Sequence, residues 1–420
     1  MIKFDEPSRQ ERVKKEKRVR EKKARVVNYE KIITTVSRFR PRYMNLPILV
    51  CVLGLSTFGV AMVYSASHYN ATIYFNNPYY FFTSQLIGLV LGIVGLSLTY
   101  HLDYKIYRRF ALPILIGAVV LLLLVFIPGL GIERLGARRW IGVGGFSMQP
   151  SEIAKFAFII FAASVASGKF SKKTDTEINI EETPKMQLNL KQLSLILLAG
   201  GGMCGLILLQ PNLSIVMTLG ATMFACLFLF GAKSKHLGML MIPVLVAVPI
   251  MLIAEPYRIS RLVAFVDPWE TPRAEGFQLI QSLFALGNGG LFGVGFGNST
   301  QKYMFLPFSE SDFIFSIIGE EFGLIGTLIY LFVLGFLITK IFAVAMKTKD
   351  TFGKFVCFGI GIVIFIQSAL NIAVVTGSIP PTGLPLPFIS FGGTSLAVFM
   401  SAVGIVLNID KQNKRIDISP

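Results

Sequence analysis

The sequence predicts an all-α polytopic membrane protein with about ten transmembrane helices and a long extracytoplasmic loop between spans 7 and 8. Three observations support this fold class. The 420-residue chain is 53% hydrophobic and only 15% charged, and its mean hydropathy is +0.63. Apolar runs of about 20 residues, the length that an α-helix needs to cross a bilayer, recur along the chain. Basic residues gather in the N-terminal tail and in alternate loops, which is the pattern that orients membrane proteins.

The first 45 residues are predicted to form a basic cytoplasmic tail. Residues 1–43 hold 15 Lys/Arg against 6 Asp/Glu, and an apolar span begins directly afterwards at Leu46. A basic chain invites a nucleic-acid function, but a basic segment beside a span favours the anionic surface of a membrane. The segment is too polar for a cleaved signal peptide. We therefore expect an uncleaved first span and no nucleic-acid partner.

Ten apolar stretches are predicted to form a helical membrane domain over residues 46–410. They lie near residues 46–66, 81–100, 110–128, 150–167, 193–210, 213–231, 237–254, 313–342, 355–375 and 391–409. Gln210-Pro211-Asn212 interrupts the fifth and sixth stretches, and proline breaks a helix, so we expect a tight reversal there. The alternative is one kinked helix and nine spans in total.

The loop charges favour ten spans with both termini in the cytoplasm. This arrangement puts the basic loops inside, including a cytoplasmic loop at 168–192 and a C-terminal tail at 411–420. Nine spans would move the basic C-terminal cluster to the outer side, against the positive-inside rule. The large loop at 255–312 is then extracytoplasmic.

Several basic residues lie on the predicted outer side and break this pattern. Arg139 precedes the fourth span, and Arg258, Arg261 and Lys302 lie in the loop 255–312. Arg258 and Arg261 are three residues apart, so in a helix they would form one basic edge. Basic groups on the outer face favour an anionic ligand there.

Few ionisable residues border the spans, where they are costly and usually serve a purpose. Glu152 and Lys155 are three residues apart on the fourth span, so they can pair, either to anchor the helix or to serve a site. Glu310 and Asp312 precede the eighth span. From the residues alone, a helix N-cap is the favoured role of Asp312. Glu320 and Glu321 lie two turns deeper in that span and are expected to face the bundle interior.

Two segments are too rich in glycine or proline to form regular helices. Residues 287–297 (GNGGLFGVGFG) lack the Lys-Ser/Thr of a nucleotide-binding loop, so we expect closely packed backbone there. Residues 376–395 (TGSIPPTGLPLPFISFGGTS) predict a re-entrant or rigid loop. No cluster in the sequence has metal-ligand spacing. From the residues, an outward-facing polar site fits an enzyme acting on an anionic lipid-linked substrate, and it also fits a transporter.

Six groups of motifs follow one another along the chain. They are RRWIG with QPSEIAK (138–155), QPNLS (210–214), DPW (267–269), FQLIQSLFALGNGGLFGVGFG (277–297), LPFSESDFIFSIIGEE (306–321) and NIAVVTGSIPPTGLPLPFISFGGTSL (371–396). In this order they resemble the SEDS family (FtsW/RodA/SpoVE), and the last motif is closer to the FtsW and SpoVE branch than to RodA. One departure is Asn212, where the family usually has an acidic residue.

The resemblance implies an inverting peptidoglycan glycosyltransferase that polymerises lipid II, the undecaprenyl-pyrophosphate-linked disaccharide pentapeptide, for the septal wall in cell division. It implies two kinds of partner: a class B penicillin-binding protein acting as transpeptidase, and other membrane proteins of the divisome. The expected location is the septum of a bacterial inner membrane. A lipid II flippase and a non-enzymatic division scaffold remain the alternatives.

The resemblance also assigns roles to individual residues. The family's essential acid falls on Asp312, which we expect to be the general base. Its arginine falls on Arg139, and its Glu/Lys pair falls on Glu152 and Lys155. The residues expected to bind substrate are Arg139, Glu152, Lys155, Arg258, Arg261 and Glu310. No cofactor is firmly implied; Mg²⁺ or Mn²⁺ could share the pyrophosphate, with no metal ligand assigned.

Overall fold

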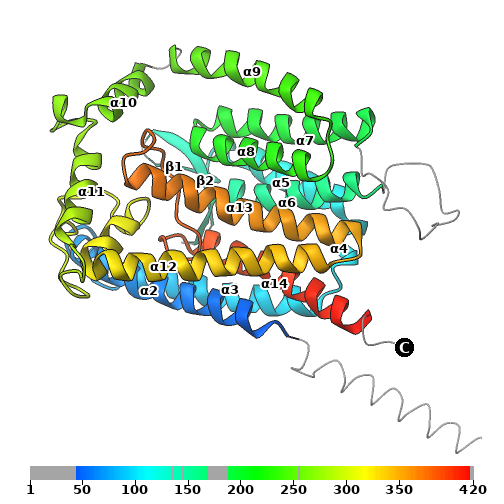
Figure 1. The fold of residues 1–420 in the computed structure, drawn as a ribbon. Coiled ribbons are helices and arrows are strands. Elements are labelled where there is room, and N and C mark those ends of the chain that lie inside the picture. The colour runs from blue at the N-terminus through cyan, green and yellow to red at the C-terminus, as the bar shows by residue number, and fades with distance from the viewer. Residues whose placement is uncertain (1–43, 135, 144–145, 169–187, 254–255, 417–420) are drawn as a thin grey trace, which may run out of the picture. The chain divides into compact units, whose positions relative to one another are not determined.

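The fold is a bundle of long helices, seen here in a computed structural model (Figure 1). The structure describes residues 44–134, 136–143, 146–168, 188–253 and 256–416. The predicted basic tail, most of the predicted loop at 168–192 and the last four residues lie outside the described residues. The mainly helical content confirms the predicted fold class.

Ten helices correspond to the ten predicted spans. They are α2 (Leu46–Phe75), α3 (Tyr80–His101), α5 (Ala111–Leu124), α6 (Pro150–Ala166), α7 (Leu190–Leu209), α8 (Leu213–Leu229), α9 (Ser234–Ile253), α12 (Ile314–Lys347), α13 (Thr351–Val375) and α14 (Gly393–Ile416). Among the described residues, six helices are long and apolar enough to cross a membrane, and α5 and α8 are shorter apolar helices. The exact number of spans stays a prediction.

The predicted reversal between the fifth and sixth stretches is confirmed. The helix α7 ends at Leu209 and α8 begins at Leu213. Asn212 caps α8, because its Oδ1 accepts a hydrogen bond of 3.4 Å from the backbone amide of Ile215. An amide side chain caps a helix without any charge. The single kinked helix of the alternative is therefore wrong.

The first helices pack against the last one through a row of small residues. On α3, Gly88, Gly92 and Gly95 lie one to two turns apart, and side chains in their place would overlap α14. Thr99 continues this face and donates a hydrogen bond of 2.8 Å to the backbone carbonyl of Ser401. Small residues let helix backbones approach closely in an apolar medium.

The interior of the bundle is formed around α6 and α13. The helix α13 packs against α6, α8 and α12, and α12 in turn packs against α2. Nearly every residue of α6 is buried, including its charged pair. A helix that is buried all round must satisfy its polar groups within the protein.

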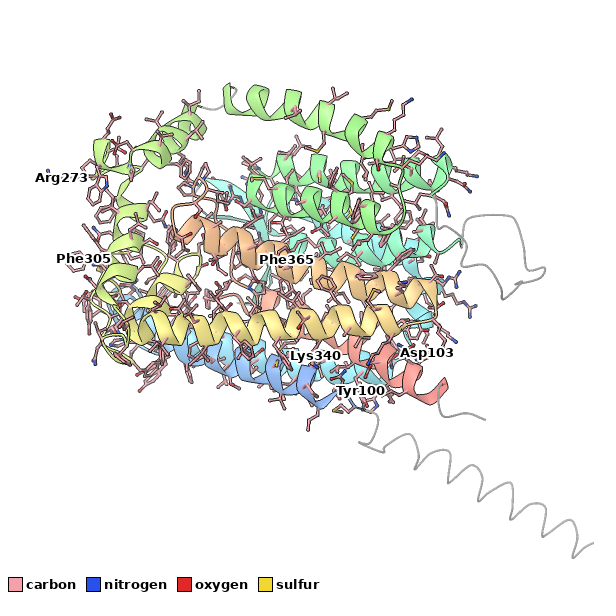
Figure 2. The ribbon with its side chains drawn as sticks, in the orientation of Figure 1. Tyr100, Asp103, Arg273, Phe305, Lys340 and Phe365 are labelled. Carbon is pink, nitrogen blue, oxygen red and sulfur yellow. The ribbon has the colours of Figure 1, made fainter. Side chains whose placement is uncertain are left out.

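The loops at the predicted outer end carry structure of their own. A three-stranded antiparallel sheet consists of β1 (Gly131–Arg134), β2 (Ala137–Val143) and β3 (Phe146–Met148). The predicted long loop contains α10 (Pro256–Val266), the 3-10 helix η2 (Pro268–Glu270) and α11 (Phe277–Asn288). At the opposite end, the short helix α4 (Lys105–Arg109) joins α3 to α5. Arg273 and Phe305 lie at one end of the bundle and Asp103 at the other (Figure 2).

The glycine-rich segment has closely packed backbone, as predicted, and it packs into a break in α12. The helix is interrupted at Gly323, whose φ of 65° and ψ of −166° are not helical. Four backbone hydrogen bonds of 2.9 to 3.1 Å join loop residues 290–295 to the broken helix at residues 320–325. A Cβ on Gly293 would overlap the carbonyl oxygen of Glu321. The loop backbone thus takes the partners that the broken helix leaves unsatisfied.

Candidate functional site

Asp312 lies in the loop immediately before α12. Phe313 occupies the N-cap position of that helix, so the predicted N-cap role of Asp312 is wrong. Its Oδ1 accepts a hydrogen bond of 3.1 Å from the Ser311 hydroxyl. Its Oδ2 lies against Gly383, where a Cβ would be only 2.9 Å away. The carboxylate is therefore available for chemistry instead of capping the helix.

The proline-rich loop after α13 holds the backbone around Asp312. Asn371 donates from Nδ2 to the carbonyl of Asp312 at 2.7 Å and to that of Leu384 at 2.6 Å. The Ser390 hydroxyl donates to the carbonyl of Ser311 at 2.6 Å. Two of these hydrogen bonds thus join α13 and loop 376–392 to the segment that carries the acid, and the third joins α13 to the loop. The predicted absence of a regular helix is confirmed for residues 376–392, and this loop forms one wall of the site.

Two predicted arginines lie close enough to Asp312 to influence its charge. Burial raises the pKa of the Asp312 carboxyl from its ordinary value of 3.8 to about 6. The hydrogen bond from Ser311 and the positive charges of Arg261 and Arg139 oppose this rise in pKa. The structure therefore brings together three predicted site residues from β2, α10 and the loop before α12.

Glu310 is the second carboxyl group of this segment. Burial raises its pKa, and the nearby charge of Asp312 raises it further, while hydrogen bonds with its own backbone and with Ser309 lower it. Its backbone carbonyl accepts a hydrogen bond of 2.8 Å from the amide of Phe391. The segment 309–312 therefore holds two carboxyl groups that favour protonation more than free carboxyls do.

Arg139 is held in place by the reversal between α7 and α8. Its Nε donates to the carbonyl of Gln210 at 3.3 Å, and its Nη2 donates to the carbonyl of Pro211. A guanidinium has five N–H donors, so a held arginine can still bind an anion. The backbone of the QPN motif thus holds the Arg139 side chain of the RRW motif, although about seventy residues separate the two motifs.

Arg258 and Arg261 both lie on α10, as the predicted basic edge requires. The side chain of Arg258 is outside the described residues. That of Arg261 is exposed, and its positive charge acts on Asp312.

The predicted pair Glu152 and Lys155 is confirmed, but it is buried inside the bundle. Lys155 Nζ lies 2.9 Å from Glu152 Oε1 and 2.5 Å from Gln367 Oε1. Ser395 donates to Glu152 Oε2 at 2.9 Å. Gln367 also donates to the carbonyl of Pro385 at 2.8 Å. The pair therefore ties α6 to α13, to α14 and to the loop beside Asp312.

Gln367 and Ser390 were not among the predicted site residues. Gln367 and Asn371 are four residues apart on α13, so they lie on one helix face, and both bond the carbonyls of loop 376–392. Amides inside an apolar span are a usable signal, since polar groups there need partners. Ser390 carries no such signal, because its role depends on the folded loop.

The described residues contain no group of three or more His, Cys, Asp or Glu side chains placed to hold a metal ion. Near the site, Glu310 and Asp312 are the carboxylates that a divalent cation could use. They do not form a complete ligand set with other side chains.

The chain was compared with known proteins. A family model described as "Cell cycle protein" (FTSW_RODA_SPOVE) matches residues 45–415. A probable peptidoglycan glycosyltransferase FtsW of Geobacter metallireducens is 40% identical over 370 residues, which cover 88% of this chain and 95% of that protein. Stage V sporulation protein E of Bacillus subtilis is 38% identical, with coverage of 88% and 98%.

Two solved structures have a similar fold. One is a chain from work on the structural coordination of polymerization and crosslinking by a peptidoglycan synthase complex. Its TM-score is 0.70 at 25% identity, with 88% of this chain and 98% of that chain covered. The other is the rod shape determining protein RodA of Thermus thermophilus, with a TM-score of 0.61 at 24% identity and coverage of 88% and 97%.

Proposed function

Because this chain belongs to the FtsW/RodA/SpoVE family of cell cycle proteins, we propose that it is a peptidoglycan glycosyltransferase that polymerises lipid II into glycan strands. Its similarity to a probable peptidoglycan glycosyltransferase and to a chain of a peptidoglycan synthase complex supports the activity. The observation that carries the proposal is the Asp312 carboxyl, whose raised pKa and two neighbouring arginines suit a base beside an anionic substrate.

Asp312 acts as the general base in this proposal. The acceptor 4-hydroxyl attacks the anomeric carbon of the donor, and its proton passes to the Asp312 carboxylate. The new O–C bond forms as the bond from that carbon to the pyrophosphate breaks, with inversion. A base works best when its pKa lies near the working pH, and such a base contributes roughly 10²–10⁴-fold in rate.

The arginines stabilise the departing pyrophosphate. Guanidinium groups bind phosphate oxygens in a bidentate, charge-assisted manner, so Arg139, Arg258 and Arg261 suit this role. Glu152 and Lys155 are buried, so they support loop 376–392 beside Asp312 from inside the bundle. A divalent cation would share the pyrophosphate charge if it were bound, but the side chains near Asp312 form no full ligand set, and the mechanism above uses none.

The proposal extends to place and partners. A multi-pass membrane protein of this family fits the bacterial inner membrane at the division septum, with both termini in the cytoplasm. Its expected partners are a class B penicillin-binding protein, which crosslinks the new strand, and other membrane proteins of the divisome. The family includes proteins of division, shape and sporulation, and the 40% identity to a FtsW favours division.

The test is polymerisation of purified lipid II by the detergent-solubilised protein, alone and with its cognate transpeptidase. Wild type is compared with Asp312→Asn and Arg261→Ala, and Arg273→Ala is the control for charge in the same loop. Glycan ladders from wild type and Arg273→Ala, with none from Asp312→Asn, would support the proposal. Equal ladders from Asp312→Asn would remove Asp312 as the base.

The alternatives give different results in the same test. A flippase would move lipid II across vesicle membranes and form no polymer. A scaffold would make no polymer, and Asp312→Asn would still support septation in cells.

A further inference from the structure

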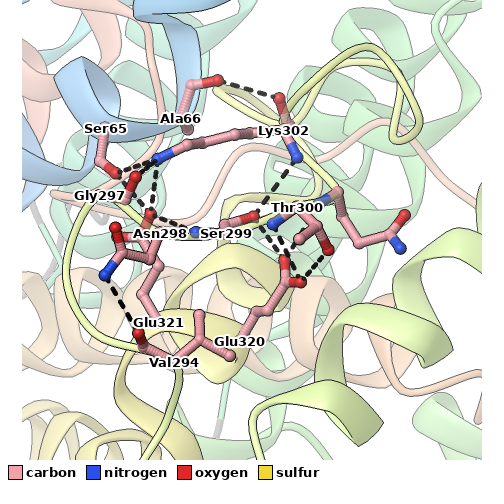
Figure 3. Close-up of polar contacts among 12 residues, drawn as sticks. Ser65, Ala66, Val294, Gly297, Asn298, Ser299, Thr300, Lys302, Glu320 and Glu321 are labelled. Carbon is pink, nitrogen blue, oxygen red and sulfur yellow. Dashed lines mark hydrogen bonds and ion pairs between the residues drawn. The ribbon is translucent and has the colours of Figure 1, made fainter.

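A second polar cluster lies beneath the loop that carries Asp312, and the mechanism above does not use it. Glu320 and Glu321, near the start of α12, face Ser299 and Lys302 of the loop and Ser65 of α2 (Figure 3). The residues Lys302 and Glu320 are fully buried, and Glu321 is 1% exposed. Three ionisable groups buried together require an explanation, since each is costly to remove from water.

Lys302 and Glu321 form the ion pair of this cluster. Lys302 Nζ lies 3.1 Å from Glu321 Oε1, and it also donates to the Gly297 carbonyl at 2.5 Å and to the Ser65 hydroxyl at 3.2 Å. Ser65 in turn donates to Glu321 Oε1 at 2.6 Å. The anionic-ligand prediction for Lys302 is therefore wrong, because its anion is a glutamate of its own chain.

Glu320 binds the backbone of the loop directly. Its carboxylate accepts hydrogen bonds from the Thr300 amide at 3.2 Å, the Thr300 hydroxyl at 2.8 Å and the Gln301 amide at 3.3 Å. It also accepts one from the Ser299 hydroxyl. Charge-assisted hydrogen bonds of this kind are stronger than neutral ones, so the turn at 299–302 is fixed to α12.

These contacts join the chain before Asp312 to the chain after it. Lys302 precedes Asp312 by ten residues, and Glu321 follows it by nine. Between them, the Ser309 hydroxyl donates to the carbonyl of Ala66 on α2 at 3.2 Å. The break in α12 at Gly323 joins the glycine-rich loop to the same helix. The ion pair and Glu320 thus hold the chain at both ends of segment 303–311, and Ser309 holds it to α2 between them.

We propose that Lys302, Glu320 and Glu321, which we call the polar clasp, position Asp312 for glycosyl transfer. This inference rests on the proposed function. The clasp residues are positioning residues, because their burial keeps them from touching a glycan. An apolar core of the same volume would serve stability as well or better. Directional ionic contacts instead fix one arrangement of the loop, which a reaction sensitive to about 1 Å of displacement requires.

The experiment compares Lys302→Met, Glu321→Gln and the double variant with wild type. The control is Lys414→Met, which removes a 2.6 Å ion pair to Asp410 in the last helix, far along the chain from the clasp. Hydrogen–deuterium exchange of peptides covering 303–313 reports how readily the backbone amides of this segment open. Steady-state polymerisation of lipid II reports kcat and KM.

The single variants should exchange faster at 303–313 than wild type and should lose up to about 10²-fold in kcat. Their KM for lipid II should stay within about twofold, because no substrate contact is removed. The double variant should be more active than either single variant, because it removes the Lys302–Glu321 ion pair as a whole and leaves neither partner buried without the other. A merely structural role would lower the yield of folded enzyme and leave the kcat of the folded fraction, and the exchange at 303–313, at their wild-type values.

Single variants with wild-type exchange and wild-type kcat would overturn the inference, and so would an unchanged kcat with a raised KM. If the single variants do not fold, Thr300→Val removes one donor to Glu320 without leaving an unpaired charge, and the same two measurements apply. If wild type makes no polymer, the proposed function fails. Exchange at 303–313 still shows separately whether the clasp holds the segment.

Discussion

Lowering the pH should switch off polymerisation as Asp312 gains a proton. A general base works only as the carboxylate, and the pKa of this carboxyl is raised to about 6 by burial. About nine tenths of the carboxyls are then ionised at pH 7, and about one tenth at pH 5. We expect kcat to fall roughly tenfold between these two pH values, with a slope of one proton.

Arg261→Ala tests the cause of this titration. The positive charge of Arg261 lowers the pKa of Asp312, so removing it should raise that pKa and move the acid limb of the kcat profile to higher pH. Arg273→Ala, in the same predicted loop, should leave the limb in place. The assay is the rate of glycan formation from lipid II at saturating substrate in buffers from pH 5 to 8.

Two outcomes would refute this reasoning. One is a kcat that stays level from pH 7 to pH 5 while the protein remains folded. The other is a limb that moves to lower pH in Arg261→Ala, which would mean that the arginine acts on another group.

Three further predictions concern stability in detergent, measured as melting temperature. Asp312→Asn should be more stable than wild type at pH 7.5, by at most about 3 kcal/mol. A carboxyl whose folded pKa is raised contributes stability below pH 3.8, and this stability is lost as the pH rises through about 6. A melting temperature below that of wild type would contradict this. Lys155→Met strands a buried glutamate and should cost about 3–5 kcal/mol, so an unchanged melting temperature would show that the ion pair is dispensable. Gly293→Ala places a Cβ where the α12 backbone lies, at a φ of 79°, and should cost more than about 1 kcal/mol, whereas Gly117→Ala, with open space around it, should be tolerated.

Much of the helical framework could be predicted from the sequence, because hydropathy depends on each residue separately. Each of the ten apolar stretches became a helix, and the Gln210-Pro211-Asn212 reversal was located to the residue. The three-stranded sheet at 131–148 was missed. Its strands have three to seven residues, too few for a clear alternating pattern, and they form because backbone groups pair across the turns.

The site was predicted less completely than the framework. Asp312 was named from its motif, while its residue pattern alone favoured an N-cap that the structure assigns to Phe313. Arg139 and Arg261 were both predicted to bind substrate, Arg139 from its motif and Arg261 as a basic residue on the outer side. Their closeness to Asp312 depends on how β2, α10 and the loop before α12 meet in space.

The sequence by itself determined that this chain is a membrane protein, where its ten apolar helices begin to within four residues, and to which family it belongs. Only the tertiary structure decided which charges meet. Lys302 looked like a ligand for an outside anion, and it is the buried partner of Glu321. The physical reason is that hydropathy acts on each residue alone, whereas the cost of a buried charge depends on partners that folding brings from distant parts of the chain.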